Sequence, residues 1–208
     1  HVVADDRLGI GHALDHLAWM DRAAVPKYVV HHDCGLHVLA AGDDFNRPAP
    51  RDIDGIFVGR TEREVAWELG AIMRAAGADG PSFDIIVASG ERGAMPHAVP
   101  QNVAIAGDTL VTIDLGAALD GYVSDCTRTF ATGVPPARLT EAYAVCHEAQ
   151  ARAVAAVRPG ISGNELDAVA RDHIAAAGFG EFFRHGLGHG VGMEVHESPG
   201  ARPESNDI

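Results

Sequence analysis

Two carboxylates in the stretch 111–130, VTIDLGAALDGYVSDCTRTF, have the spacing of a metal-binding pair. Apolar and polar side chains alternate along both halves of the stretch, which predicts two half-buried strands. Asp120 and Gly121 between them form a typical two-residue hairpin turn. With these two residues as the turn, Asp114 and Asp125 become diagonal neighbours on one face of the hairpin. Such positions lie roughly 7–8 Å apart, and from there both side chains could reach two divalent ions about 3.5–4 Å apart.

The same two residues have a simpler interpretation. Asp114 and Asp125 could be solvated side chains on the open face of the hairpin. If they are buried instead, leaving both carboxylates without a partner would be costly, and a cation is expected between them. The hairpin alone leaves both alternatives open.

A second candidate group lies in the segment 185–197, HGLGHGVGMEVHE. Glycine occupies every second position from 186 to 192, which is unfavourable for a helix. In an extended segment these glycines share one bare face, where another backbone or a ligand can approach closely. His185 and His189 lie on the other face, and an imidazole at His189 is a natural ligand for a metal ion already held by carboxylates. A hydrogen-bonded turn histidine is the alternative, but three histidines within twelve residues favour a site.

Composition limits the classes of function. The 208 residues are 47% hydrophobic and 22% charged, which predicts a globular fold. The net charge of −13 argues against binding to nucleic acid or anionic membranes. No apolar run of 18 residues and no signal peptide is visible. The three cysteines are odd in number and lack metal-type spacing, which is typical of reduced thiols. A cytoplasmic location is therefore expected.

Two helices are predicted to start with the same capping motif. Thr61 is followed three residues later by Glu64, and Ser162 by Glu165, which are capping boxes. Apolar residues at helical spacing follow each box. A fixed offset of 101 residues relates Gly59, Thr61, Glu64, Val65 and Gly77 to Gly160, Ser162, Glu165, Leu166 and Gly178. Chance agreement of two ordinary helices is the alternative, but the shared offset favours an internal duplication.

Other elements follow from local patterns. A buried strand is predicted over 83–88, followed by a loop that carries Met95-Pro96-His97. An alanine-rich helix is predicted over 137–157, where Arg158-Pro159-Gly160 ends it.

The first 52 residues are harder to assign. A helix over 8–20 and short strands at 27–30 and 36–40 are the best interpretation, without an associated chemistry. We therefore divide the chain into an N-terminal segment of uncertain role, residues 1–52, which could be a remnant of an upstream domain, and a domain over 53–208.

From about residue 58 onward the chain resembles metallopeptidase family M24, which has the pita-bread fold and includes methionine aminopeptidases and Xaa-Pro peptidases. The resemblance is carried, in order, by the motifs GRTEREVA, SF-IVASG, PH-VP, GD-LVTIDLGA, GY-SD-TRTF, RPG and HGLGHGVG-VHE-P. The wording IDLGA with GYVSDCTRTF is closer to the Xaa-Pro aminopeptidase and dipeptidase branch. The resemblance implies an α+β pita-bread fold with a pseudo-twofold helix–strand repeat.

The resemblance also implies a dinuclear metal site. Asp114 would bind one metal ion, Asp125 would bridge both, and His189 would bind the other. Manganese or cobalt would suit these oxygen-rich ligands best, with iron or zinc as alternatives. A hydroxide shared by the metals would attack the peptide carbonyl.

Three histidines would serve the substrate. His97 would contact the substrate or steady the leaving nitrogen, His196 would stabilise the tetrahedral intermediate, and His185 would line the pocket. The implied reaction is hydrolysis of N-terminal or dipeptide Xaa-Pro bonds, with a peptide that has proline at its second position as substrate. The resemblance also allows a homodimer.

The sequence departs from the family pattern beyond His189. The family uses five metal ligands, and its last two are glutamates, one of them in a Glu-Pro-Gly context. Neither context surrounds Glu194, Glu197 or Glu204. We expect a domain without its C-terminal strands, with weak metal binding and impaired turnover. The alternative is an inactive pita-bread homologue or truncated gene product that acts at most as a binding module, although the retained Asp114, Asp125 and His189 favour an enzyme.

Overall fold

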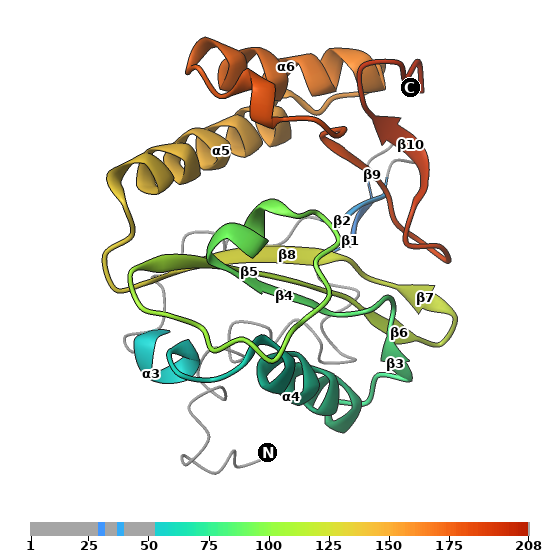
Figure 1. Cartoon of the computed structure of the whole chain (residues 1–208). Helices are drawn as coiled ribbons and strands as arrows, with labels where there is room; N and C mark the ends of the chain where they lie inside the picture. Colours follow the sequence, from blue (N-terminus) through green and yellow to red (C-terminus); the bar gives the residue numbers. More distant parts are fainter. Residues whose placement is uncertain (1–28, 32–36, 40–52, 208) are drawn as a thin grey trace. The chain divides into compact units, whose positions relative to one another are not determined.

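The computed structural model describes residues 29–31, 37–39 and 53–207, which form two compact units (Figure 1). Unit 1 comprises His1–Asp120 and Asp125–Pro135, and unit 2 comprises Gly121–Ser124 and Pro136–Ile208. Each unit is described by itself.

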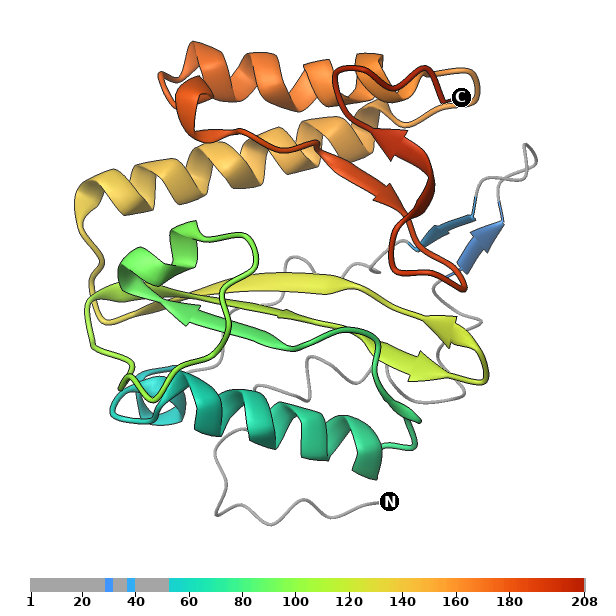
Figure 2. The same ribbon diagram turned by 45° about the vertical axis from the view of Figure 1, so that its right-hand side comes forward.

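Unit 1 is built on an antiparallel three-stranded sheet with the order β4–β5–β8. Helix α4 runs along one face of this sheet in both views (Figures 1 and 2). The described elements of unit 1 are β1 (Val29–His31), β2 (His37–Leu39), α3 (Ile53–Phe57), α4 (Glu62–Ala75), β3 (Gly80–Pro81), β4 (Ile86–Ser89), η3 (Gly90–Ala94), β5 (Thr109–Leu115), β6 (Ala117–Leu119) and β8 (Cys126–Thr132).

The core of unit 1 is formed by apolar residues that recur at every second position of strand β5 and at helical spacing in α4. Every second residue of β5 faces inward, and α4 contributes apolar residues at helical spacing. The core residues that these two elements supply are Val111, Ile113, Leu115, Val65, Leu69 and Met73, each at most 6% exposed. The alternate residues of β5, including Asp114, are half-buried on the opposite face.

The predicted hairpin is present, but its strands change sheets. Asp120 and Gly121 both have positive φ, 51° and 85°, which is typical of a type I′ turn. The pairing of Asp114 with Thr127 is the register that this turn predicts. However, the ladder is interrupted at Gly116, whose carbonyl accepts from Ser82 N–H at 2.9 Å. Beyond this point β6 pairs with β3 in a separate antiparallel sheet.

Unit 2 contains two helices that pack side by side and an antiparallel hairpin, β9–β10 (Figure 2). Its small core is formed by residues at helical spacing on the two helices and by Phe179. The elements are β7 (Tyr122–Val123), α5 (Ala137–Ala156), α6 (Gly163–Ala176), η4 (Gly180–Phe182), β9 (Gly188–Gly190) and β10 (Glu197–Ala201).

The structure confirms the local repeat. Helices α4 and α6 are both 14 residues long, carry capping boxes and have bounds that differ by 101 residues. Their first amides are capped in the same way: two consecutive N–H groups donate to two carbonyls that are two residues apart in a later segment. These carbonyls belong to Val103 and Gln101 for α4 and to Asp207 and Ser205 for α6, at 2.8–3.2 Å.

Some boundaries differ from the prediction. The buried strand is β4, at 86–89 rather than 83–88, because Ser82 bonds to Gly116 and the chain runs irregularly until Ile86. The long helix starts at Ala137 as predicted and ends at Ala156, one residue before the predicted end at 157. Strands β1 and β2 overlap the two predicted N-terminal strands, whereas the helix predicted over 8–20 lies outside the described residues. None of the helices in the described part has the length and apolarity needed to cross a bilayer.

Candidate functional site

Asp114 lies on β5, on the face of the sheet that is opposite the core. Asp114 pairs with Thr127, whose hydroxyl donates to Asp114 Oδ1 at 2.6 Å. Asp125 directly precedes β8, where the ladder is interrupted, and is half-buried. It is two residues before Thr127, so an extended chain directs the Asp125 side chain to the same face as Asp114.

Both carboxylates act electrostatically on the neighbouring thiol. Burial raises the pKa of Cys126, and the negative charges of Asp114 and Asp125 raise it further against the opposing effect of Arg128. The thiol therefore stays protonated at neutral pH, so it is a poor metal ligand. Cys126 and Cys146 are both free thiols, as predicted. Of these neighbouring groups, the carboxylates are therefore better ligands for a divalent ion than the thiol.

His97 is exposed in the turn that follows η3, and a buried carboxylate holds the surrounding loop. Glu62, the first residue of α4, is fully buried. Its carboxylate accepts hydrogen bonds from Ser89 N–H at 2.8 Å, from Arg92 Nε at 2.9 Å and from Gln101 N–H at 3.1 Å. These partners flank His97 on both sides in the sequence, so the network closes the loop that presents it.

In unit 2 the hairpin β9–β10 brings two of the predicted histidines together. His189 lies on β9 and His196 directly precedes β10, and their ring centres are 4.1 Å apart. His189 Nδ1 lies 3.0 Å from the Gly190 carbonyl oxygen. A carbonyl can only accept, so Nδ1 carries the proton and Nε2 is the nitrogen with metal-binding character. His185 makes the same type of bond to the Gly186 carbonyl at 2.7 Å.

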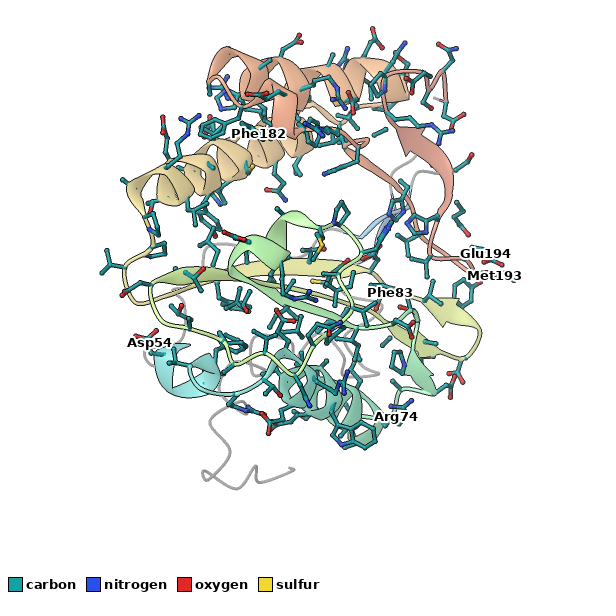
Figure 3. The ribbon with its side chains drawn as sticks, in the orientation of Figure 1. Asp54, Arg74, Phe83, Phe182, Met193 and Glu194 are labelled. Carbon is teal, nitrogen blue, oxygen red and sulfur yellow. The ribbon has the colours of Figure 1, made fainter. Side chains whose placement is uncertain are left out.

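The glycine-rich segment allows the close approach that its sequence predicts. A Cβ atom added to Gly190 would lie 2.5 Å from the Ser198 carbonyl oxygen on β10. One added to Gly192 would lie 2.2 Å from the Glu197 carboxylate. The loop that joins β9 to β10 carries Met193 and Glu194 at its tip (Figure 3). At position 190, only glycine therefore allows β9 and β10 to pair as they do.

Sequence reasoning missed the buried charges that hold these loops. In unit 1 this charge is Glu62. In unit 2 it is Asp167, which bonds to Arg171 at 2.6 Å, and Arg171 in turn bonds to the main chain at His185. Asp167 lies on the apolar stripe of α6, three residues before Ala170 and seven before Ile174. An acidic residue inside an apolar stripe, with arginine four residues later, is the signal that could have identified the pair.

The predicted metal ligands fit an oxygen-preferring divalent ion by type: two carboxylates and one imidazole in the tautomer that can bind. They are divided between units, with Asp114 and Asp125 in unit 1 and His189 in unit 2. Within the part of the chain that the structure describes, no three His, Cys, Asp or Glu side chains gather as a metal-binding group.

A surface hollow of about 650 Å³ lies elsewhere in unit 1. It is lined by α4 and neighbouring residues, among them Arg60, Trp67 and Glu68, and by none of the predicted site residues. Trp67 is 80% exposed there. The hollow is open and is lined by residues of both charges, so its chemistry indicates no particular ligand.

Comparison with known families assigns the class of protein. The family model described as "Metallopeptidase family M24" matches residues 21–207, so the chain belongs to this family. The fold is accordingly the mixed α/β pita-bread fold, which the resemblance predicted. The match begins inside the segment 1–52, and the proposed boundary near residue 52 stays a prediction.

Among curated proteins, the chain is 53% identical over 150 residues to the uncharacterized peptidase YqhT of Bacillus subtilis, and 49% identical over 147 residues to an Xaa-Pro dipeptidase of Pyrococcus horikoshii. These matches cover 72% and 71% of this chain and 42% of each relative. The chain thus spans about two fifths of the length of these relatives.

Solved structures of peptidases also align with this chain over about half of their own length or less. The prolidase from Pyrococcus furiosus aligns with a TM-score of 0.72 and 45% identity, covering 74% of this chain and 46% of the prolidase. The dipeptidase PepE from Mycobacterium ulcerans aligns over 98% of this chain and 46% of its own, with a TM-score of 0.70 and 32% identity.

Proposed function

We propose that this chain carries metal-binding and substrate-binding residues of a peptidase that hydrolyses Xaa-Pro bonds in dipeptides or at the N-terminus of peptides. The observation that supports this most directly is the pairing of Asp114 with Thr127, because in this register an extended chain would direct Asp125, two residues before Thr127, to the same face as Asp114. The names of the relatives, Xaa-Pro dipeptidase and prolidase, support the choice of proline-containing substrates.

In this proposal Asp114 and His189 would each hold one of two divalent ions, and Asp125 would contribute to holding both. Bound there, the ions would supply Lewis acidity and would make water nucleophilic at neutral pH. The hydrogen bond from Thr127 orients the Asp114 carboxylate, and the bond from His189 to the Gly190 carbonyl fixes the imidazole. Manganese or cobalt suits these ligands, with iron or zinc as alternatives.

The other histidines act on the substrate. His97 donates a hydrogen bond to the substrate or to the leaving nitrogen. His196 stabilises the oxyanion as the carbonyl becomes tetrahedral, which is the type of interaction that lowers such barriers most. His185 lines the pocket. We further propose a cytoplasmic location and a homodimer.

The 208 residues contain three of the five ligands that the resemblance implies. We therefore propose weak metal binding and low turnover for these residues alone. A catalytically inactive role as a binding module is the alternative, and the test separates the two.

The test is a calorimetric titration of the purified chain with Mn²⁺, together with an assay of Ala-Pro hydrolysis. We compare the wild type with Asp125→Asn and with a control, Asp84→Asn, which changes an exposed aspartate of unit 1 that is outside the site. Loss of Mn²⁺ binding in Asp125→Asn alone would support the proposal. Equal Mn²⁺ binding in all three proteins would refute the bridging role, and Mn²⁺ binding without proline release would favour the binding module.

A further inference from the structure

In unit 2 a buried ion pair links helix α6 to the segment that carries His185 and His189. Asp167 is 1% exposed and lies one helical turn before Arg171. Asp167 Oδ2 accepts from Arg171 Nε at 2.6 Å, and Oδ1 accepts from Nη2 at 3.0 Å. Burying a carboxylate is costly unless it is paired and hydrogen-bonded. The bidentate geometry meets both conditions, and it raises the pKa of Arg171.

The remaining hydrogen bonds of the pair go to the main chain of residues 183–187. Arg171 donates from Nη1 to the Phe183 carbonyl at 2.8 Å and from Nη2 to the His185 carbonyl at 2.7 Å. Asp167 Oδ1 also accepts from Leu187 N–H at 2.9 Å. Three alternate residues of the segment are therefore held from a single helical turn.

Side-chain contacts continue the same chain of interactions. The Arg171 guanidinium carbon lies 4.4 Å from the centre of the Phe183 ring. The Phe183 ring in turn meets the His185 imidazole at 4.8 Å in an edge-on arrangement. The orientation of His185 is thus coupled both to the main chain that Arg171 holds and to the ring against which Arg171 packs.

We propose that Asp167 and Arg171 are positioning residues that hold the segment from His185 to His189 in the conformation needed for substrate and metal. This inference rests on the proposed function, in which His185 lines the pocket and His189 is a ligand. The segment needs such support because its glycines at 186 and 188 increase the conformational entropy that must be lost on ordering.

Unit 1 supplies an independent instance of the same design. Glu62 is likewise a buried carboxylate on the apolar stripe of its helix and bonds to an arginine, Arg92. Arg92 donates to the Val99 carbonyl at 2.6 Å, two residues beyond His97. In both units a carboxylate and an arginine thus hold the main chain next to a predicted site histidine.

Two variants and a matched control test the proposal in the full 208-residue chain. Arg171→Lys keeps the charge but replaces a planar fork of donors with a single ammonium, which cannot satisfy the carboxylate and both carbonyls. Asp167→Asn keeps the shape and removes the charge. The control is Arg152→Lys in α5, because Glu148 and Arg152 form a pair of the same spacing at 2.8 Å in which both side chains are 53% exposed.

The first measurement is hydrogen–deuterium exchange. Because bonds to charged groups are lost, we expect exchange in residues 183–190 to accelerate about 10- to 100-fold in Arg171→Lys and Asp167→Asn. Helices α5 and α6 should keep their protection, and Arg152→Lys should match the wild type. Equal acceleration throughout unit 2 would mean that the ion pair only stabilises the unit as a whole, which would overturn the proposal. Unchanged exchange in 183–190 would overturn it as well.

The second measurement is the ¹⁵N shift of the His185 ring nitrogens, with the signal assigned through His185→Gln. The bond from Nδ1 to the Gly186 carbonyl fixes one tautomer in the wild type. Both variants should move the shifts towards the average of an unconstrained imidazole, whereas an unmoved signal would contradict a positioning role. If the wild type does not bind Mn²⁺, the proposed function fails for this chain, but the exchange and the ring shifts still decide the positioning role.

Discussion

The same substitution is expected to have opposite effects at Gly188 and Gly190, which flank His189 on β9. A Cβ atom at Gly190 would lie 2.5 Å and 2.7 Å from the carbonyl oxygens of Ser198 and Glu197. Both oxygens are main-chain atoms of β10, so they cannot rotate away as a side chain could. At Gly188 an added Cβ meets no described atom within 4 Å.

The two magnitudes follow from these distances. Overpacking against a backbone costs about 1–3 kcal/mol. For a loss of about 2 kcal/mol in the free energy of unfolding, the melting temperature of Gly190→Ala should fall by roughly 4–8 °C. Gly188→Ala meets no obstacle and reduces the entropy of the unfolded chain, which stabilises by about 0.4–1 kcal/mol. Its melting temperature should be unchanged or rise by roughly 2 °C.

The assay is thermal unfolding followed by circular dichroism, together with a Mn²⁺ titration. Gly190→Ala forces β10 away from β9, which separates His189 from the His196 ring that lies 4.1 Å away. We therefore expect weaker Mn²⁺ binding in Gly190→Ala and no change in Gly188→Ala. Equal melting temperatures for the two variants would refute the reasoning, because they would show that β10 does not approach Gly190 as closely as the structure has it.

Three further predictions concern single contacts. Thr127→Val removes the 2.6 Å hydrogen bond to Asp114, and calorimetry should show about tenfold weaker Mn²⁺ binding with little change in the melting temperature. Gly163→Ala places a Cβ 2.0 Å from the Gly200 carbonyl oxygen, so denaturant unfolding should show a loss of about 1–3 kcal/mol, although alanine is the better helix former. Hydrogen bonds from the main chain and hydroxyl of the N-cap residue lower the pKa of Glu165. Their contribution to stability is present above the unfolded-state pKa of about 4.3 and is lost as the pH falls further, so Glu165→Gln should show a shallower loss of stability in acid.

The helices could be predicted from the sequence because their signals are local. A capping box needs only two residues three positions apart, and both predicted boxes are present at the starts of α4 and α6. The turn at Asp120 and Gly121 is equally local, and once it is placed it determines which residues of β5 and β8 face each other. The pairing of Asp114 with Thr127 was therefore predictable before any tertiary contact was known.

The change of sheet at Gly116 was not predictable in the same way. It depends on a hydrogen bond from Ser82, which is 34 residues earlier in the chain (116 − 82), and alternation along 111–119 continues without a visible break. The buried charges were missed for a related reason. Asp167 and Glu62 are acidic, so a hydrophobic pattern assigns them to the solvent side, and only their distant partners explain their burial.

The repeated helices show which features of a duplicated unit must persist. Both helices retain the capping box and the two downstream carbonyls that accept their first amides, because unpaired buried N–H groups would be costly in either unit. The carboxylates that hold the loops, in contrast, do not occupy equivalent positions in the two helices. The position equivalent to Glu62 is Gly163, where a Cβ would meet the Gly200 carbonyl, and unit 2 instead uses Asp167, four residues later. The main-chain capping therefore fixes the helix, whereas the side chain that holds the loop can differ, and each half can present its own histidines.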